Sequence, residues 1–322
     1  MKAQQPRDTA PAAAPELRPR IRGGTAGTWW SRHNHEVAPY LFVLPFFVIY
    51  AVFFLYPVVS AFILSFYKAV GLGSRTFVGL NNYVALASDP RYLKALGNTT
   101  LYTLASVFIL SPLALMVAMA VRSFIVPSPN MKSFYRIAFF LPNLTSFVVI
   151  ALMFALIFNK DFGMLNQALG SLGLPKVGWL REVRLALPSI VMVAIWTFLG
   201  INSLYFLAGL QNIPEEMNEA ASIDGATRWQ TFWRVTIPLL RPTILFVVVQ
   251  AVIFSYQLFD LPYLLTGGGP SDATLTLAMY LYTIGFSQFS LGYAAAIGYS
   301  IAMIAVVVSV FQFGLFRLWG EE

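Results

Sequence analysis

Six long apolar runs constrain the fold of this chain more than any other feature of its sequence. Each exceeds the roughly 20 residues that a helix needs to cross a bilayer core of about 30 Å. Within such a core the backbone groups must pair inside the segment, which favours helices. We therefore expect an all-α integral membrane protein with spans at 40–67, 98–121, 134–158, 187–210, 242–264 and 291–316.

The composition agrees with this interpretation. Hydrophobic residues make up 58% of the chain and charged residues 11%, and the mean hydropathy is +0.69. Soluble domains carry about 25% charged residues. The net charge of +7 is spread over the loops rather than gathered on one soluble face, so it does not indicate a nucleic-acid partner.

The spans and loops divide the chain into three predicted parts. Residues 1–38 are rich in proline, alanine and arginine and predict a disordered tail. Residues 39–318 form the membrane domain, and residues 212–241 form a polar loop within it. Six spans put both termini and this loop on one side, and most of the 21 basic residues fall in that set, which predicts a cytoplasmic location for all three.

The polar loop 212–241 carries the pattern of a helical hairpin. Pro214 suits a first helical turn, and Glu215 and Glu216 follow at the positive end of the helix dipole. Gly225 can adopt the left-handed conformation that closes the helix, and a second helix is expected to end at Pro238 and Pro242. Its acidic surface indicates a protein partner; the alternative is an amphipathic hairpin lying on the membrane.

The sequence also argues against several kinds of chemistry. It contains no G-x-x-x-x-G-K-[ST] loop, so we expect no ATP bound through a P-loop. It has no cysteine, no pair of catalytic carboxylates and no set of metal ligands. We therefore expect no enzyme activity, metal or cofactor in this chain.

Several motifs resemble the permease subunits of bacterial ABC importers. Glu219, Ala220, Ala221, Gly225 and Pro238 match the EAA loop of that family at its spacing, with Val235 and Ile237 as conservative departures. Residues 77–83 and 136–142 are similar to sugar-type permeases, and the Gly-Gly-Gly-Pro run at 267–270 is similar to the maltose and glycerol-3-phosphate branch in particular.

The resemblance implies a fold, a location and partners. It implies the six-helix type I importer permease fold in the bacterial plasma membrane, paired with a second six-span permease as a heterodimer. Two ATPase subunits would carry ATP and magnesium, and an extracytoplasmic sugar-binding protein would deliver substrate. The residues expected at the ATPase coupling helix are Glu215, Glu216, Glu219, Ala220, Ala221, Asp224 and Gly225.

The resemblance also implies a substrate pathway on the spans that flank the polar loop. Polar side chains within spans usually face a cavity or another helix, and sugars need amides or hydroxyls beside aromatic faces. Interhelical hydrogen bonding is the alternative role, and for Asp260 a helix cap. Gln250 and Gln257 are seven residues apart, hence on one helical face. The expected pathway residues are Trp196, Gly200, Asn202, Ser203, Gln250, Phe254, Gln257 and Asp260.

These inferences predict the transmembrane subunit of a carbohydrate importer, for a disaccharide or oligosaccharide of the maltose or trehalose type, that works by alternating access. A permease of the same family for glycerol-3-phosphate or glycerophosphodiesters is the alternative. A self-sufficient secondary carrier is a rival from another class. That rival predicts an internal inverted repeat, which the sequence does not show.

Overall fold

The computed structural model describes residues 29–71, 73–122 and 129–320. The chain divides into two units, Met1–Val58 and Val59–Glu322, which are described separately. The first unit contains α1 (Trp29–Tyr50), the π-helix η1 (Ala51–Leu55) and the start of α2 (Tyr56–Leu64). The helix therefore begins at Trp29, inside the predicted tail of residues 1–38, and the rest of that tail lies outside the described residues.

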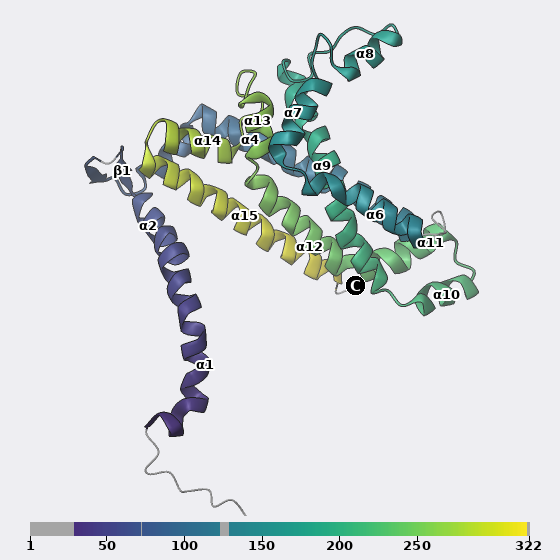
Figure 1. The fold of residues 1–322 in the computed structure, drawn as a ribbon, viewed down its shortest axis with the longest axis horizontal. Helices are drawn as coiled ribbons and strands as arrows, with labels where there is room; N and C mark the ends of the chain where they lie inside the picture. The colour runs from purple at the N-terminus through teal and green to yellow at the C-terminus, as the bar shows by residue number, and fades with distance from the viewer. Residues whose placement is uncertain (1–28, 72, 123–128, 321–322) are drawn as a thin grey trace, which may run out of the picture. The chain divides into compact units, whose positions relative to one another are not determined.

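The second unit is almost entirely helical (Figure 1). Its only sheet within the described ranges is a two-stranded antiparallel hairpin, in which Tyr67 pairs with Phe77. Its elements are β1 (Tyr67–Ala69), β2 (Arg75–Phe77), α3 (Asn81–Ser88), α4 (Pro90–Ala105), η2 (Ser106–Leu110), α5 (Ser111–Arg122), α6 (Pro129–Leu144), α7 (Phe147–Ile157), α8 (Met164–Ser171), α9 (Val183–Gln211), α10 (Glu215–Ile223), α11 (Arg228–Thr231), η3 (Phe232–Thr236), α12 (Ile237–Tyr256), α13 (Asp260–Thr266), α14 (Leu277–Tyr282), η4 (Thr283–Ser287) and α15 (Leu291–Gly320).

Five helices in the described part of the chain are long and apolar enough to cross a membrane: Pro39–Leu64, Pro90–Arg122, Val183–Gln211, Arg228–Tyr256 and Leu291–Phe316. A sixth span arises if Ile137–Leu144 and Phe147–Ile157, which meet at an angle of 102°, are counted together. The prediction of an all-α membrane fold is confirmed.

Prolines explain three of the four π-helices found in the described residues. Pro57, Pro112 and Pro238 each follow a π-helix by two residues, after η1, η2 and η3. A proline ring clashes with the carbonyl four residues earlier and has no N–H to donate. The wider π turn falls at that carbonyl in each case, so the helix continues past the proline.

One predicted boundary is wrong for this reason. The second helix of the polar hairpin does not end at Pro238 or Pro242, because α11, η3 and α12 form one continuous helix from Arg228 to Tyr256. The predicted span 134–158 consists of two helices that meet in a bend at Thr145 and Ser146 after Pro142, and the pair taken together forms the sixth candidate span.

The predicted span 242–264 is also interrupted. Helix α12 ends at Tyr256 and α13 begins at Asp260, so Gln257 lies in a turn and not on the helical face of Gln250. Pro262 gives the physical reason. It sits in the first turn of α13, where its missing N–H leaves no helical bond unmade, and this position favours a new helix start.

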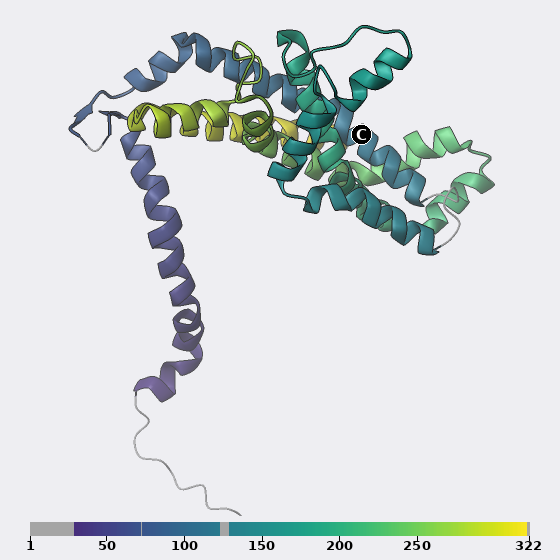
Figure 2. The same cartoon turned by 45° about the horizontal axis from the view of Figure 1, so that its top comes forward.

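Helix α9 organises the core of the second unit, packing against α5, α6 and α12, while α12 lies beside α15 (Figure 1). Gly200 of α9 lets α6 approach so closely that a Cβ there would lie 1.8 Å from the carbonyl oxygen of Phe139. The hairpin of α10 and α11 lies at one end of this unit, and α14 lies at the other (Figures 1 and 2).

Candidate functional site

A cavity of about 470 Å³ opens between the spans of the second unit. Its wall is formed by the break between α12 and α13, the start of α7, α9 and the α4–η2 segment. The lining residues are Tyr102, Ser106, Leu110, Asn143, Phe147, Phe198, Ile201, Asn202, Tyr205, Gln250, Ala251, Phe254, Ser255, Gln257, Leu258, Phe259, Asp260 and Leu261.

The polar groups of this wall are amides, hydroxyls and one carboxylate set among aromatic rings. The Gln250 amide donates to the Tyr205 hydroxyl at 3.3 Å, and the Asn202 amide donates to the Phe198 carbonyl at 2.9 Å. The other end of the Gln250 amide, Oε1, is buried with no hydrogen-bond partner in the described part of the chain. Since buried polar atoms are nearly always hydrogen-bonded, this acceptor would be satisfied if the Gln250 side chain turned its amide toward a hydroxyl in the cavity that it lines.

Five of the eight predicted pathway residues come together at the cavity. Asn202 lies on α9 and Gln250 and Phe254 on α12, whereas Gln257 and Asp260 belong to the interruption between α12 and α13. Phe254, Gln257 and Asp260 are exposed. Gln250 and Phe254 thus reach the cavity from α12, whereas Gln257 and Asp260 reach it from the interruption itself.

The other three predicted pathway residues lie elsewhere on α9. Gly200 is buried against Phe139 of α6, and Ser203 is buried with its hydroxyl donating to the Leu199 carbonyl at 2.6 Å. Trp196 is 40% exposed and packs edge-on against Phe154. None of the three lines the cavity.

Several lining residues are absent from the predicted set. Tyr102 and Ser106 come from the second span, and Asn143 and Phe147 flank the bend after α6. The polar Asn143 directly after Pro142 is the sequence signal for this part of the wall. Tyr102 and Ser106 have no comparable signal, because hydroxyls in a span often bond within their own helix.

The polar hairpin is well formed at the end of the second unit. Helix α10 starts at Glu215, directly after Pro214, with Glu215 and Glu216 in its first turn. Gly225 has the left-handed φ of +75° expected for a helix end, and the N–H of Ala226 donates to the Ala221 carbonyl at 2.9 Å. Thr227 and Gln230 then form a capping box at the start of α11.

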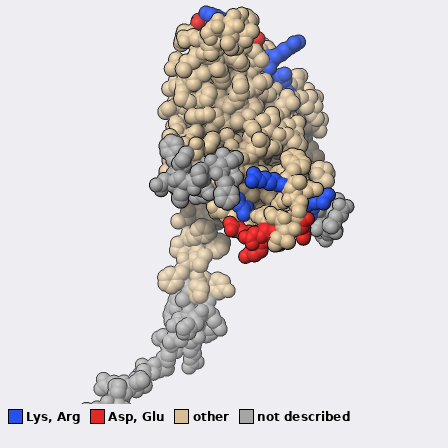
Figure 3. All heavy atoms as spheres, turned by 90° about the vertical axis from the view of Figure 1, so that its right-hand side faces the viewer, with Lys and Arg blue, Asp and Glu red and all other residues tan. Residues whose placement is uncertain are grey.

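The surface of this hairpin is charged and partly apolar. Glu215, Glu216, Glu219 and Asp224 are all exposed, and Figure 3 shows acidic side chains gathered at this end beside basic ones. Ile223 is 86% exposed on the same segment. Ala220 is exposed and Ala221 half-buried. Exposed apolar side chains beside this acidic cluster make the hairpin a candidate protein-binding surface.

Within the described residues no group of three or more histidine, cysteine, aspartate or glutamate side chains could hold a metal ion. Membrane-spanning helices, a cavity lined by aromatic rings and a few polar side chains, and a charged hairpin at one end are the arrangement expected of a membrane transport subunit.

The family follows from the sequence. Residues 111–318 match the family described as "Binding-protein-dependent transport system inner membrane component", and the chain belongs to this family. It is a transport subunit rather than an enzyme, and it spans the inner membrane several times.

Known relatives cover most of the chain. It is 38% identical over 285 residues to the arabinooligosaccharides transport system permease protein AraP of Bacillus subtilis, across 88% of this chain and 90% of the relative. It is 33% identical to the sn-glycerol-3-phosphate transport system permease protein UgpA of Agrobacterium fabrum, across 87% of this chain and 94% of the relative.

A solved structure shares the fold. The bacterial alginate ABC transporter in complex with alginate pentasaccharide-bound periplasmic protein contains a chain with a TM-score of 0.79 and 23% identity. The match covers 91% of the present chain and 98% of that chain. The importer permease fold is thus confirmed.

Proposed function

We propose that this chain is one permease subunit of an ATP-driven, binding-protein-dependent importer of neutral oligosaccharides, and that the cavity holds the sugar during alternating access. The amide of Gln250 carries this proposal, because the residue lines the cavity and the amide has an acceptor without a partner in the described part of the chain. A sugar hydroxyl can donate to such an acceptor, and an amide can both donate and accept.

The chemistry of the wall favours a neutral substrate over an anionic one. The rings of Phe147, Phe198, Phe254 and Phe259 supply apolar faces. No lysine or arginine of the described residues lines the cavity, and its one ionisable acid is Asp260. A phosphate group would meet no cation here and would face a like charge, which disfavours glycerol-3-phosphate.

The hairpin supplies the coupling element of the proposal. Glu215, Glu216, Glu219, Ala220, Ala221, Asp224 and Gly225 would dock into a cleft of an ATPase subunit, which would place the hairpin and both termini in the cytoplasm. A second six-span permease, two ATPase subunits that bind ATP and magnesium, and an extracytoplasmic binding protein would complete the complex. Relatives of the binding-protein-dependent family support this arrangement.

The substrate class is tested by uptake into proteoliposomes that contain the complete complex and its binding protein. The substrates are labelled maltose, trehalose, an arabinooligosaccharide and glycerol-3-phosphate, each with internal ATP. We expect uptake of at least one neutral oligosaccharide and none of glycerol-3-phosphate. ATP-dependent uptake of glycerol-3-phosphate alone would contradict the neutral-sugar proposal.

A further inference from the structure

The loop between α13 and α14 has an unusual backbone. Four of its residues have a left-handed φ: Gly267 (59°), Gly268 (91°), Ser271 (50°) and Asp272 (57°). Glycine adopts this region freely, but serine and aspartate do so at a cost that surrounding contacts must offset. At Asp272 these contacts come from outside the loop.

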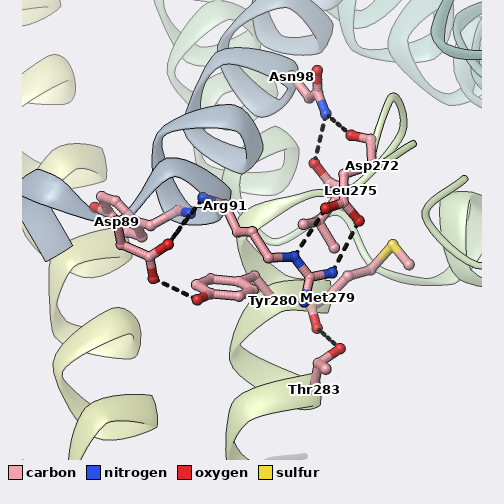
Figure 4. Close-up of polar contacts among 9 residues, drawn as sticks. Asp89, Arg91, Asn98, Asp272, Leu275, Met279, Tyr280 and Thr283 are labelled. Atoms are coloured by element: carbon pink, nitrogen blue, oxygen red, sulfur yellow. Dashed lines mark hydrogen bonds and ion pairs between the residues drawn. The ribbon is translucent and has the colours of Figure 1, made fainter. Parts of the chain in front are cut away.

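Helix α4 provides these contacts from two positions (Figure 4). Arg91 donates from Nε and from a terminal guanidinium nitrogen to the two carboxylate oxygens of Asp272, both at 2.9 Å. One amide nitrogen of Asn98 donates to the carbonyls of Asp272 at 2.8 Å and Leu275 at 2.9 Å. Arg91 and Asn98 are seven residues apart and thus on one face of α4.

The end of α4 that carries Arg91 is itself fixed. Asp89 caps the helix and accepts hydrogen bonds from the hydroxyls of Tyr280 and Tyr293, and Arg91 lies over the Tyr280 ring (Figure 4). Burial raises the pKa of Asp89, but these hydroxyls and two backbone N–H groups outweigh it and hold the pKa below its usual value. The carboxylate therefore stays charged at neutral pH.

The far end of the loop bonds to the break between α12 and α13. The hydroxyl of Thr276 donates to the carbonyl of Leu258 at 2.6 Å, and the N–H of Leu277 donates to the Thr99 hydroxyl of α4 at 3.1 Å. In a continuous helix the Leu258 carbonyl would bond to the N–H of residue 262, which is a proline. Thr276 thus satisfies the carbonyl that Pro262 leaves open, at the break that lines the cavity.

We propose that Arg91 and Asp272 are positioning residues for the substrate: by holding the 267–276 loop against α4, they fix the α12–α13 break and the side chains that it brings to the cavity. The contacts run from Arg91 to Asp272, along the loop to Thr276, and from Thr276 to Leu258. Gln257 and Asp260 flank Leu258 and line the cavity. This inference rests on the proposed role of the cavity.

The test uses Asp272→Asn and Arg91→Gln, each alone and together. Asparagine tolerates the left-handed backbone and keeps the side-chain volume, so Asp272→Asn removes the charge alone. The Arg91 and Asp272 side chains are 47% and 35% exposed. The loss of substrate affinity on breaking the pair should therefore not exceed the small free energy that an exposed ion pair contributes. The substrate concentration for half-maximal uptake should rise about two- to fivefold, with the maximal ATPase rate unchanged.

The two residues should act as a unit. The double variant should then resemble the single variants, because each already removes the ion pair. Lys94→Gln removes an exposed cation from the same helix and serves as the matched control. Lys94→Gln should leave the substrate concentration for half-maximal uptake unchanged. Size-exclusion chromatography should show intact complexes for every variant.

A second readout reports on position directly. The chain has no cysteine, so Gln257→Cys accepts a single spin label at the break. The label should become more mobile in Asp272→Asn and Arg91→Gln but not in Lys94→Gln. If both variants leave the mobility of the label and the substrate concentration for half-maximal uptake unchanged, the positioning role is overturned.

Gln250→Leu, measured in parallel, separates this failure from a failure of the proposed function. If Gln250→Leu raises the substrate concentration for half-maximal uptake and Asp272→Asn does not, the cavity remains the substrate site and only the positioning role is lost. If neither does, the cavity is not the substrate site, and both proposals fall.

Discussion

Substitution of Glu219 by lysine or of Gly225 by valine is expected to abolish sugar uptake while leaving the permease inserted in the membrane. Glu219 is exposed on α10, and an acidic side chain desolvated in an ATPase cleft needs a basic partner there. Losing one member of such a pair costs roughly 2–5 kcal/mol. Gly225 has a φ of +75°, which a β-branched residue rarely adopts, so valine distorts the turn between α10 and α11.

The measurement is co-purification of the ATPase subunit together with substrate-stimulated ATP hydrolysis. Gly173→Val is a matched control for backbone strain, because Gly173 has a φ of +73° with open space around it and lies after α8 instead of in the hairpin. It should leave ATPase co-purification intact. Wild-type hydrolysis and uptake in Glu219→Lys and Gly225→Val would show that the hairpin is not the coupling element.

Substitution of Gln250 by leucine is expected to weaken the substrate site about five- to hundredfold. Leucine keeps most of the volume and suits a helix, so assembly and basal ATPase activity should persist. When a sugar hydroxyl loses its hydrogen-bond partner, the binding free energy weakens by about 1–3 kcal/mol, which corresponds to this five- to hundredfold range. Sugar binding to the isolated binding protein should not change. Uptake at limiting and saturating sugar in proteoliposomes measures the effect.

Gln312→Leu is the matched control for Gln250→Leu. Gln312 lies on α15, away from the residues that line the cavity, and its Oε1 is also buried without a partner among the described residues. Leucine at this position should leave the substrate concentration for half-maximal uptake near the wild-type value. Equal losses in both variants, or dissociated complexes, would assign Gln250 a packing role.

The apolar runs were sufficient to predict an all-α membrane fold, because a long apolar helix is the simplest way to satisfy a backbone inside lipid. The fixed spacing from Glu219 to Pro238 makes the hairpin recognisable in the sequence, and Gly225 has the left-handed φ expected of it. The ends of the helices were harder to predict. A proline can terminate a helix, as Pro262 helps to do, or be absorbed by a π turn, as Pro238 is.

The cavity was only partly predictable for the same reason. Gln250 and Asn202 stood out as amides inside spans, and both line the cavity. Gln257 also lines it, but from a turn rather than from the predicted helical face. Gly200 does not, because its missing side chain serves close packing against α6. The ion pair of Arg91 with Asp272 joins residues 181 positions apart, and no local pattern in the sequence indicates it.

The central claim is that this chain transports only as part of an ATP-driven complex, and reconstitution with and without its partners tests it most directly. Proteoliposomes that hold the chain, a second permease, the ATPase and the binding protein should take up sugar when ATP is supplied. Liposomes that hold this chain alone should show none, with or without a proton or sodium gradient. Gradient-driven uptake by the lone chain would contradict the account and identify a secondary carrier.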